Sequence, residues 1–133
     1  MNEQEHIQSL RLLRTTETAT AYAQAKATER PPEGCRLCAD PATIREYEHW
    51  RIMPNRFPYD RYYERSDMLV LKRHARESEL TDAERTELCS LKEGALGEQY
   101  DQLLENLPHK QSIPHHCHLH LVTIRPPAPD TAS

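Results

Sequence analysis

The chain has 133 residues, of which 37% are hydrophobic and 29% are charged, and its formal net charge is −4. This length predicts one domain with a modest core. The negative charge gives no electrostatic footprint for duplex nucleic acid, and no apolar run is long enough to span a membrane. The polar start MNEQEH lacks the apolar segment of a signal peptide, so we expect a cytoplasmic protein with reduced thiols.

The first third of the chain predicts a helix and then a turn. Residues 3–29 contain spaced leucines and the alanine-rich stretch ATAYAQAKA, which favours a helix, and Pro31 and Pro32 end it. We therefore treat residues 1–30 as an N-terminal helical extension. The segment EGCRLCADP follows as a turn-bound knuckle, and residues 43–55 are predicted to form a strand or a pair of strands.

The rest of the chain predicts a loop, a strand, a long helix and a last strand. Residues 55–67 are a predicted loop, and DMLVLKRH is a buried strand that ends at His74. Residues 80–108 are predicted to form one long helix that starts at a Thr81–Glu84 capping box, with Gly94 permitting a kink. A strand follows at about 115–125, and residues 126–133 are an expected disordered tail. The fold class is α+β, an antiparallel sheet packed against one long helix.

The stretch SIPHHCHLHL places three histidines on alternate residues of the last predicted strand. Because side chains two apart share one face of a strand, His116, His118 and His120 point the same way. Cys117 and Leu119 then point to the core. The plain alternative is a histidine-rich surface strand, but the strict alternation favours a functional face.

Cys35 and Cys38 form a single CxxC pair. A redox pair of this kind opens a helix in a βαβ unit, whereas this pair lies in a proline-bounded turn. Two more ligands would complete a tetrahedral structural zinc site. A redox pair and an inert remnant remain the alternatives.

The sequence resembles the histidine triad (HIT) superfamily, whose motif alternates three histidines with apolar residues. The matching stretch runs from His116 to Val122, and MLVLKRH, LTDAERTEL and NRFPYD resemble the strand, the helix start and the nucleotide-facing loop of that family. The resemblance covers roughly residues 35–125, so residues 31–125 are a predicted HIT-like domain. The N-terminal helix lies outside the match.

The resemblance implies an enzyme that acts at the α-phosphate of a nucleotide conjugate, as a phosphoramidase or a dinucleoside polyphosphate hydrolase does. By position in the motif, His118 is the nucleophile that forms a nucleotidyl-histidine intermediate, and His120 contacts the phosphate or acts as an acid. Asn55, Gln111 and Ser112 match substrate-binding positions, although Ser112 stands four residues before His116 instead of three. The family also implies a homodimer and a small-molecule nucleotide substrate, without duplex nucleic acid or a membrane.

The resemblance extends to the zinc-containing members of the superfamily and to the related galactose-1-phosphate uridylyltransferases. It implies that Cys35, Cys38, His74 and His116 hold a structural zinc ion. His49 and His115 compete for the fourth position. Two other functions stay open: a non-catalytic, zinc-stabilised module that binds nucleotides or partners, and a metal-sensing protein.

Overall fold

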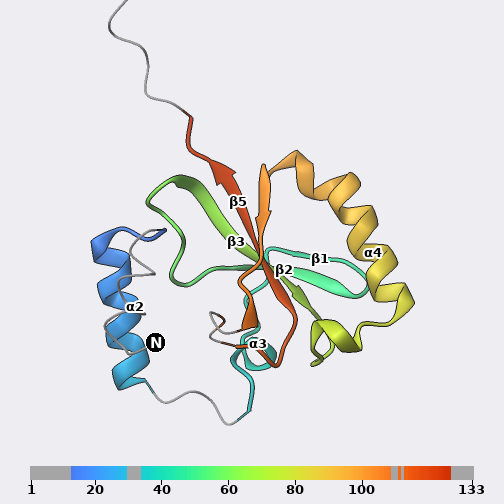
Figure 1. Cartoon of the computed structure of the whole chain (residues 1–133), viewed down its shortest axis with the longest axis horizontal. Helices are drawn as coiled ribbons and strands as arrows, with labels where there is room; N and C mark the ends of the chain where they lie inside the picture. Colours follow the sequence, from blue (N-terminus) through green and yellow to red (C-terminus); the bar gives the residue numbers. More distant parts are fainter. Residues whose placement is uncertain (1–12, 30–33, 109–110, 112, 127–133) are drawn as a thin grey trace, which may run out of the picture.

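The computed structural model describes residues 13–29, 34–108, 111 and 113–126. It confirms the α+β class: five strands form one sheet in the order β1-β2-β3-β5-β4, and every neighbouring pair is antiparallel (Figure 1). The strands are β1 (Arg45–Glu46), β2 (Trp50–Pro54), β3 (Tyr63–Leu71), β4 (Gln102–Leu104) and β5 (His118–Ile124). The helices are α2 (Thr16–Thr28), α3 (Arg36–Ala39) and α4 (Asp82–Glu93), with 3-10 turns η1 (Glu77–Glu79) and η2 (Ala95–Glu98).

The histidine motif lies on β5, which pairs with β3 and β4 inside the sheet. In the register between β3 and β5, Val70 lies opposite His118, and Met68 lies opposite His120. Strand alternation therefore sends the two histidines to one face and Leu119 to the other. The predicted alternation holds, although β5 begins only at His118, so His116 lies just before the strand.

The core lies between the sheet and α4. Apolar side chains from the strands meet the helix in one cluster, which comprises Trp50, Ile52, Leu69, Leu71, Ala75, Leu80, Leu91, Leu96, Tyr100, Leu119 and Leu121. The indole nitrogen of Trp50 donates to the carbonyl of Glu84 at 2.9 Å, which fixes α4 on β2. With this face buried against a helix, the other face of the sheet is left to form a site.

The start of α4 agrees with the sequence, but its end does not. Thr81 and Glu84 form the predicted capping box, and Arg73 on the preceding loop holds Glu84 through two hydrogen bonds of 2.9 and 3.0 Å. The prediction of one helix over 80–108 is wrong, since α4 ends at Glu93 and Gly94 leaves helical geometry. The chain then turns through η2 and returns to the sheet as β4, so its apolar residues reach the core without a continuous helix.

Helix α2 packs on the loop between β2 and β3, on the other side of the sheet from α4 (Figure 1). Its N-cap residue Thr15 donates its backbone N–H to Asp60 at 2.9 Å, and Thr18 donates its hydroxyl to the same carboxylate at 2.5 Å. At the other end, Arg56 forms a double hydrogen bond with Glu29. Within the described residues, the predicted helix over 3–29 begins only at Thr16, because Leu13 lies in a turn; residues 1–12 lie outside the described part.

Two further predictions need comment. The predicted loop over 55–67 is too long, because β3 already begins at Tyr63 and extends the sheet. The predicted disordered tail lies almost wholly outside the described residues. In the described part of the chain, no helix is long and apolar enough to cross a membrane.

Candidate functional site

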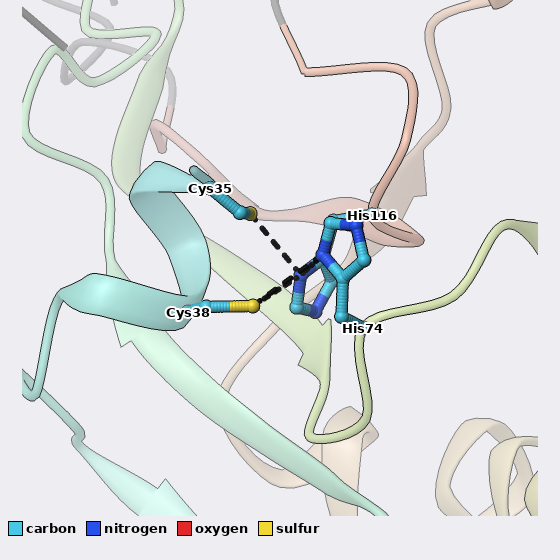
Figure 2. A group of neighbouring side chains, drawn as sticks. All are labelled: Cys35, Cys38, His74 and His116. Carbon is cyan, nitrogen blue, oxygen red and sulfur yellow. Dashed lines mark hydrogen bonds between the residues drawn. The ribbon is translucent and has the colours of Figure 1, made fainter. Parts of the chain in front are cut away.

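Four side chains from three separate segments converge beside the histidine strand. Cys35 and Cys38 come from the α3 knuckle, His74 from the turn after β3, and His116 from the segment before β5 (Figure 2). Their candidate ligand atoms all lie within 4.8 Å of one another. His116 is buried, Cys35 is half-buried, and Cys38 and His74 are exposed. The sequence-predicted set is thus brought together, and it could hold a metal ion.

The distances in this cluster suit a tetrahedral site. Nδ1 of His116 lies 3.3 Å from Sγ of Cys35, 3.4 Å from Sγ of Cys38 and 3.3 Å from Nδ1 of His74. Zinc–sulfur bonds of about 2.3 Å and zinc–nitrogen bonds of about 2.0 Å at tetrahedral angles separate ligand atoms by roughly 3.3–3.8 Å. Two thiols and two imidazoles are also the ligand types that favour zinc.

A backbone carbonyl orients His116 toward the cluster. Its Nε2 donates to the carbonyl of Leu71 at 2.5 Å, so the unprotonated Nδ1 faces the two cysteines and His74. Burial also lowers the pKa of His116 and keeps the ring neutral, which is the form that binds a metal. Burial raises the pKa of the Cys38 thiol, so a metal would have to displace its proton.

The knuckle is fastened by a residue that the sequence interpretation missed. Arg51 on β2 donates from Nη2 to the carbonyls of Leu37 and Asp40 at 2.6 and 2.8 Å, and from Nη1 to Thr43 at 2.9 Å. These bonds tie the CxxC turn and the residues that follow it to the sheet. A lone arginine in a strand carries no pattern that would have indicated this role.

The face of β5 opposite the α4 core opens on a cavity of about 590 Å³. The cavity brings together the predicted catalytic residues His118 and His120 with the predicted substrate-binding residues Asn55 and Gln111. Its apolar walls come from Leu37, Met53, Met68, Phe57 and Ile113. Ser112 lies outside the described residues. The volume falls in the range of small-molecule sites.

His118 has a defined tautomer. Its Nδ1 donates to the backbone carbonyl of His116 at 2.8 Å, which leaves Nε2 with a lone pair. Burial lowers the pKa of His118, so the ring is neutral near pH 7. A neutral imidazole with a free Nε2 is the nucleophilic form of histidine.

His120 lies in a buried network with Tyr59 and Asn106. Asn106 donates to the Tyr59 hydroxyl at 3.0 Å, and this hydroxyl lies 3.3 Å from Nε2 of His120. Burial, followed by the charges on neighbouring groups, lowers the pKa of His120 to about 3. At neutral pH, His120 is therefore uncharged and can act as a hydrogen-bond donor, but not as a cationic acid.

The two predicted amide residues are held by their surroundings. Asn55 accepts the backbone N–H of Phe57 at 3.1 Å, so its side chain stabilises the loop as well as lining the cavity. Gln111 donates to the carbonyl of Asn106 at 2.5 Å. Both side chains thus have a fixed position at the wall.

The two histidines that compete for the metal cluster lie elsewhere. His115 is exposed, and its Nδ1 lies 3.0 Å from Nη2 of Arg76. His49 lies in the turn between β1 and β2, where its backbone N–H donates to Glu87 at 2.7 Å. Neither belongs to the cluster of four in the described structure.

No model of a known protein family matches this chain, and no curated protein matches it either. The class of the protein is therefore described from its fold and its site alone. It is an α+β protein in which a Cys2His2 cluster that could hold a metal ion adjoins a cavity lined by two histidines.

Proposed function

We propose that the protein is a HIT-type nucleotide hydrolase or transferase that forms a covalent intermediate on His118. The observation that carries the proposal is the fixed tautomer of this residue, with Nδ1 bound to the His116 carbonyl and a free Nε2 on a residue that lines the cavity. The alternation of the three histidines, two at the cavity and one at the cluster, supports the same assignment.

The proposed reaction has two displacement steps at the α-phosphorus. In the first, Nε2 of His118 attacks, an N–P bond forms, and the bond to the leaving group breaks; the leaving group keeps the electron pair and takes a proton from solvent. In the second step, water attacks phosphorus and loses a proton, and the N–P electron pair returns to Nε2. The net products are a nucleoside monophosphate and the protonated leaving group.

His120 has a supporting role in this proposal. Because the ring is neutral, it stabilises the phosphoryl oxygens by a hydrogen bond and does not transfer a proton as imidazolium. Tyr59 and Asn106 orient the ring, since hydrogen-bond contacts run without a break from the half-buried Asn106 through the buried Tyr59 to His120. Gln111 and Asn55 supply amide groups to the substrate at the cavity wall.

We further propose that the metal is zinc and that its role is structural. The donor set of two thiols and two neutral imidazoles is complete for four-coordinate zinc and leaves no open position for a substrate. The ion would fix His116, whose backbone carbonyl in turn holds His118. When bound, zinc supplies rigidity, and the chemistry belongs to the side chains.

Turnover of a nucleoside phosphoramidate by the purified, zinc-loaded protein tests the proposal. We expect release of the amine from the wild type and a loss of at least about 1,000-fold in kcat for His118→Gln, which keeps the size of the side chain but lacks the nucleophile. His115→Gln is the matched control, because His115 is exposed and hydrogen-bonded outside the cavity. Nucleotide binding without turnover by the wild type would favour the non-catalytic module instead.

A further inference from the structure

The N-terminal segment contributes a cation to the wall of the cavity. Arg14 precedes helix α2 by two residues, lines the same cavity as His118 and His120, and is only 5% exposed. The segment is anchored on both sides of Arg14. Arg61 donates its backbone N–H to the carbonyl of Leu13 at 3.0 Å, and Thr15 donates to Asp60. The position of Arg14 is thus built into the fold.

Two aromatic rings and one carbonyl hold the guanidinium. Its central carbon lies 4.5 Å from the ring centre of Tyr22 and 4.7 Å from that of Tyr59, and Nε donates to the carbonyl of Phe57 at 2.7 Å. Tyr59 also stacks at 4.6 Å on His120. The ring of Tyr59 therefore lies between Arg14 and His120.

No carboxylate neutralises Arg14 among the described residues. Asp60 is near enough to favour its charged form, but Asp60 accepts hydrogen bonds from Thr15 and Thr18 instead. Burial lowers the pKa of Arg14, yet a guanidinium remains charged at neutral pH. Glu29, which also lines the cavity, is paired with Arg56 at the far end of α2.

Some buried polar atoms at the cavity wall have no hydrogen-bond partner among the described residues. In the described part of the chain, the buried side-chain polar atoms without a partner are Nη1 of Arg14 and Nδ1 of His120. Both residues line the cavity. A buried donor without an acceptor is destabilising, and more so when it is charged, so Nη1 of Arg14 points to a missing acceptor at this end of the cavity.

We propose that Arg14 is a substrate-binding residue, and that its guanidinium binds phosphate oxygens of the nucleotide at the His120 end of the cavity. This inference rests on the proposed function. Because Nη1 is buried, binding requires the guanidinium to turn between Tyr22 and Tyr59 until Nη1 faces the anion, and phosphate then accepts from the arginine at two oxygens. The N-terminal extension is then part of the substrate site and not a separate appendage.

Calorimetric binding of AMP, adenosine and pyrophosphate to the zinc-loaded full chain tests this role. For Arg14→Met we expect AMP and pyrophosphate to bind roughly 10- to 100-fold more weakly and adenosine to bind within about 2-fold of the wild type. Arg14→Lys, which keeps the charge but not the fork, is expected to recover part of the AMP affinity. Arg45→Met is the matched control, because Arg45 is exposed on the edge strand β1.

A measurement on the wild type covers the case in which the variants do not fold. In protein labelled with 15N-arginine, the Nε signal of Arg14 should shift on addition of AMP and pyrophosphate but not of adenosine. An unchanged Nε signal, or equal AMP affinity in a folded Arg14→Met, overturns the Arg14 proposal. If the same protein still turns over nucleotides, the proposed enzyme function stands. Pyrophosphate binding that depends on Arg14, without any turnover, supports the anion site and contradicts the proposed enzyme function. No binding of either anion by the wild type overturns the Arg14 proposal.

Discussion

Burial determines the protonation state of His120 at the cavity wall. His120 is 7% exposed, and removing its ring from water disfavours the charged form, which lowers its pKa to about 3. The unfolded chain has no such restriction and takes up a proton as the pH falls below 6.5. Protonation therefore stabilises the unfolded state relative to the folded state, and the free energy of unfolding decreases from pH 6.5 toward pH 3.

The first prediction concerns this pH dependence. Between pH 7 and pH 5, His120 alone should remove about 2 kcal/mol from the free energy of unfolding, since each pH unit below 6.5 contributes about 1.4 kcal/mol. Urea denaturation of the wild type and of His120→Asn at both pH values measures the difference, and the other histidines cancel in the comparison. Equal pH dependence in the two proteins would contradict the burial of a neutral ring.

The sequence predicted which side chains come together better than it predicted their hydrogen-bond partners. The alternation of His116, His118 and His120 follows from the two-residue period of a strand and was visible in the chain. Tyr59 and Arg14 carry no comparable pattern, because they reach the cavity through a loop and a turn whose path depends on tertiary packing. Only the structure places Tyr59 against His120 and Arg14 against Tyr59.

At the scale of elements, the short helix α3 positions two candidate metal ligands, Cys38 within it and Cys35 at its N-cap. It has four residues, and its N-cap residue Cys35 makes no capping hydrogen bond through its side chain. The hydrogen bonds from Arg51 to the carbonyls of Leu37 and Asp40 hold this short helix in place without such a cap. The knuckle is thus positioned by β2.

The second prediction follows from this anchoring. Arg51→Met should weaken metal binding roughly 10-fold, the usual effect of losing a residue that orients metal ligands, although no ligand is changed. Competition with a chromophoric chelator measures the affinity, with Arg45→Met as control. Unaltered affinity in a folded Arg51→Met would show that the knuckle holds its shape without β2.

The helices also show where sequence patterns fail. The apolar spacing of Leu96, Tyr100 and Leu103 fits a helix, but α4 ends at Gly94. These side chains reach the same core from η2, from the loop after it and from β4. Periodicity reports that residues face the core, and it does not distinguish the local structure that brings them there. The capping box at Thr81 was a local signal, and it was confirmed.

At the scale of the whole molecule, the segment from His116 to His120 connects the cluster to the cavity. His116 belongs to the cluster, and its carbonyl holds His118 at the cavity. The four candidate ligands bring the knuckle and the turn after β3 against this segment, where Nε2 of His116 donates to the Leu71 carbonyl and the N–H of Cys117 donates to the Ala75 carbonyl at 2.7 Å. A metal ion would therefore stabilise the site and the fold together.

The third prediction is that one zinc ion per chain binds and that its removal lowers Tm. Metal analysis of protein purified without a histidine tag gives the stoichiometry, and calorimetry with and without a chelator gives the change in Tm. Cys38→Ser should bind less than a tenth as much zinc, whereas Cys89→Ser, an exposed cysteine on α4, should bind the same amount as the wild type. A stoichiometry well below one, or a Tm insensitive to the chelator, would contradict a structural zinc.

The most direct test of the central claim is the detection of the covalent intermediate. The protein is mixed with a nucleoside phosphoramidate, quenched without acid, digested and examined by mass spectrometry. We predict one nucleotidyl group on the peptide that contains His118, and no group on that peptide in His118→Gln. Turnover without an adduct under single-turnover conditions, or an adduct on another residue, would contradict the account.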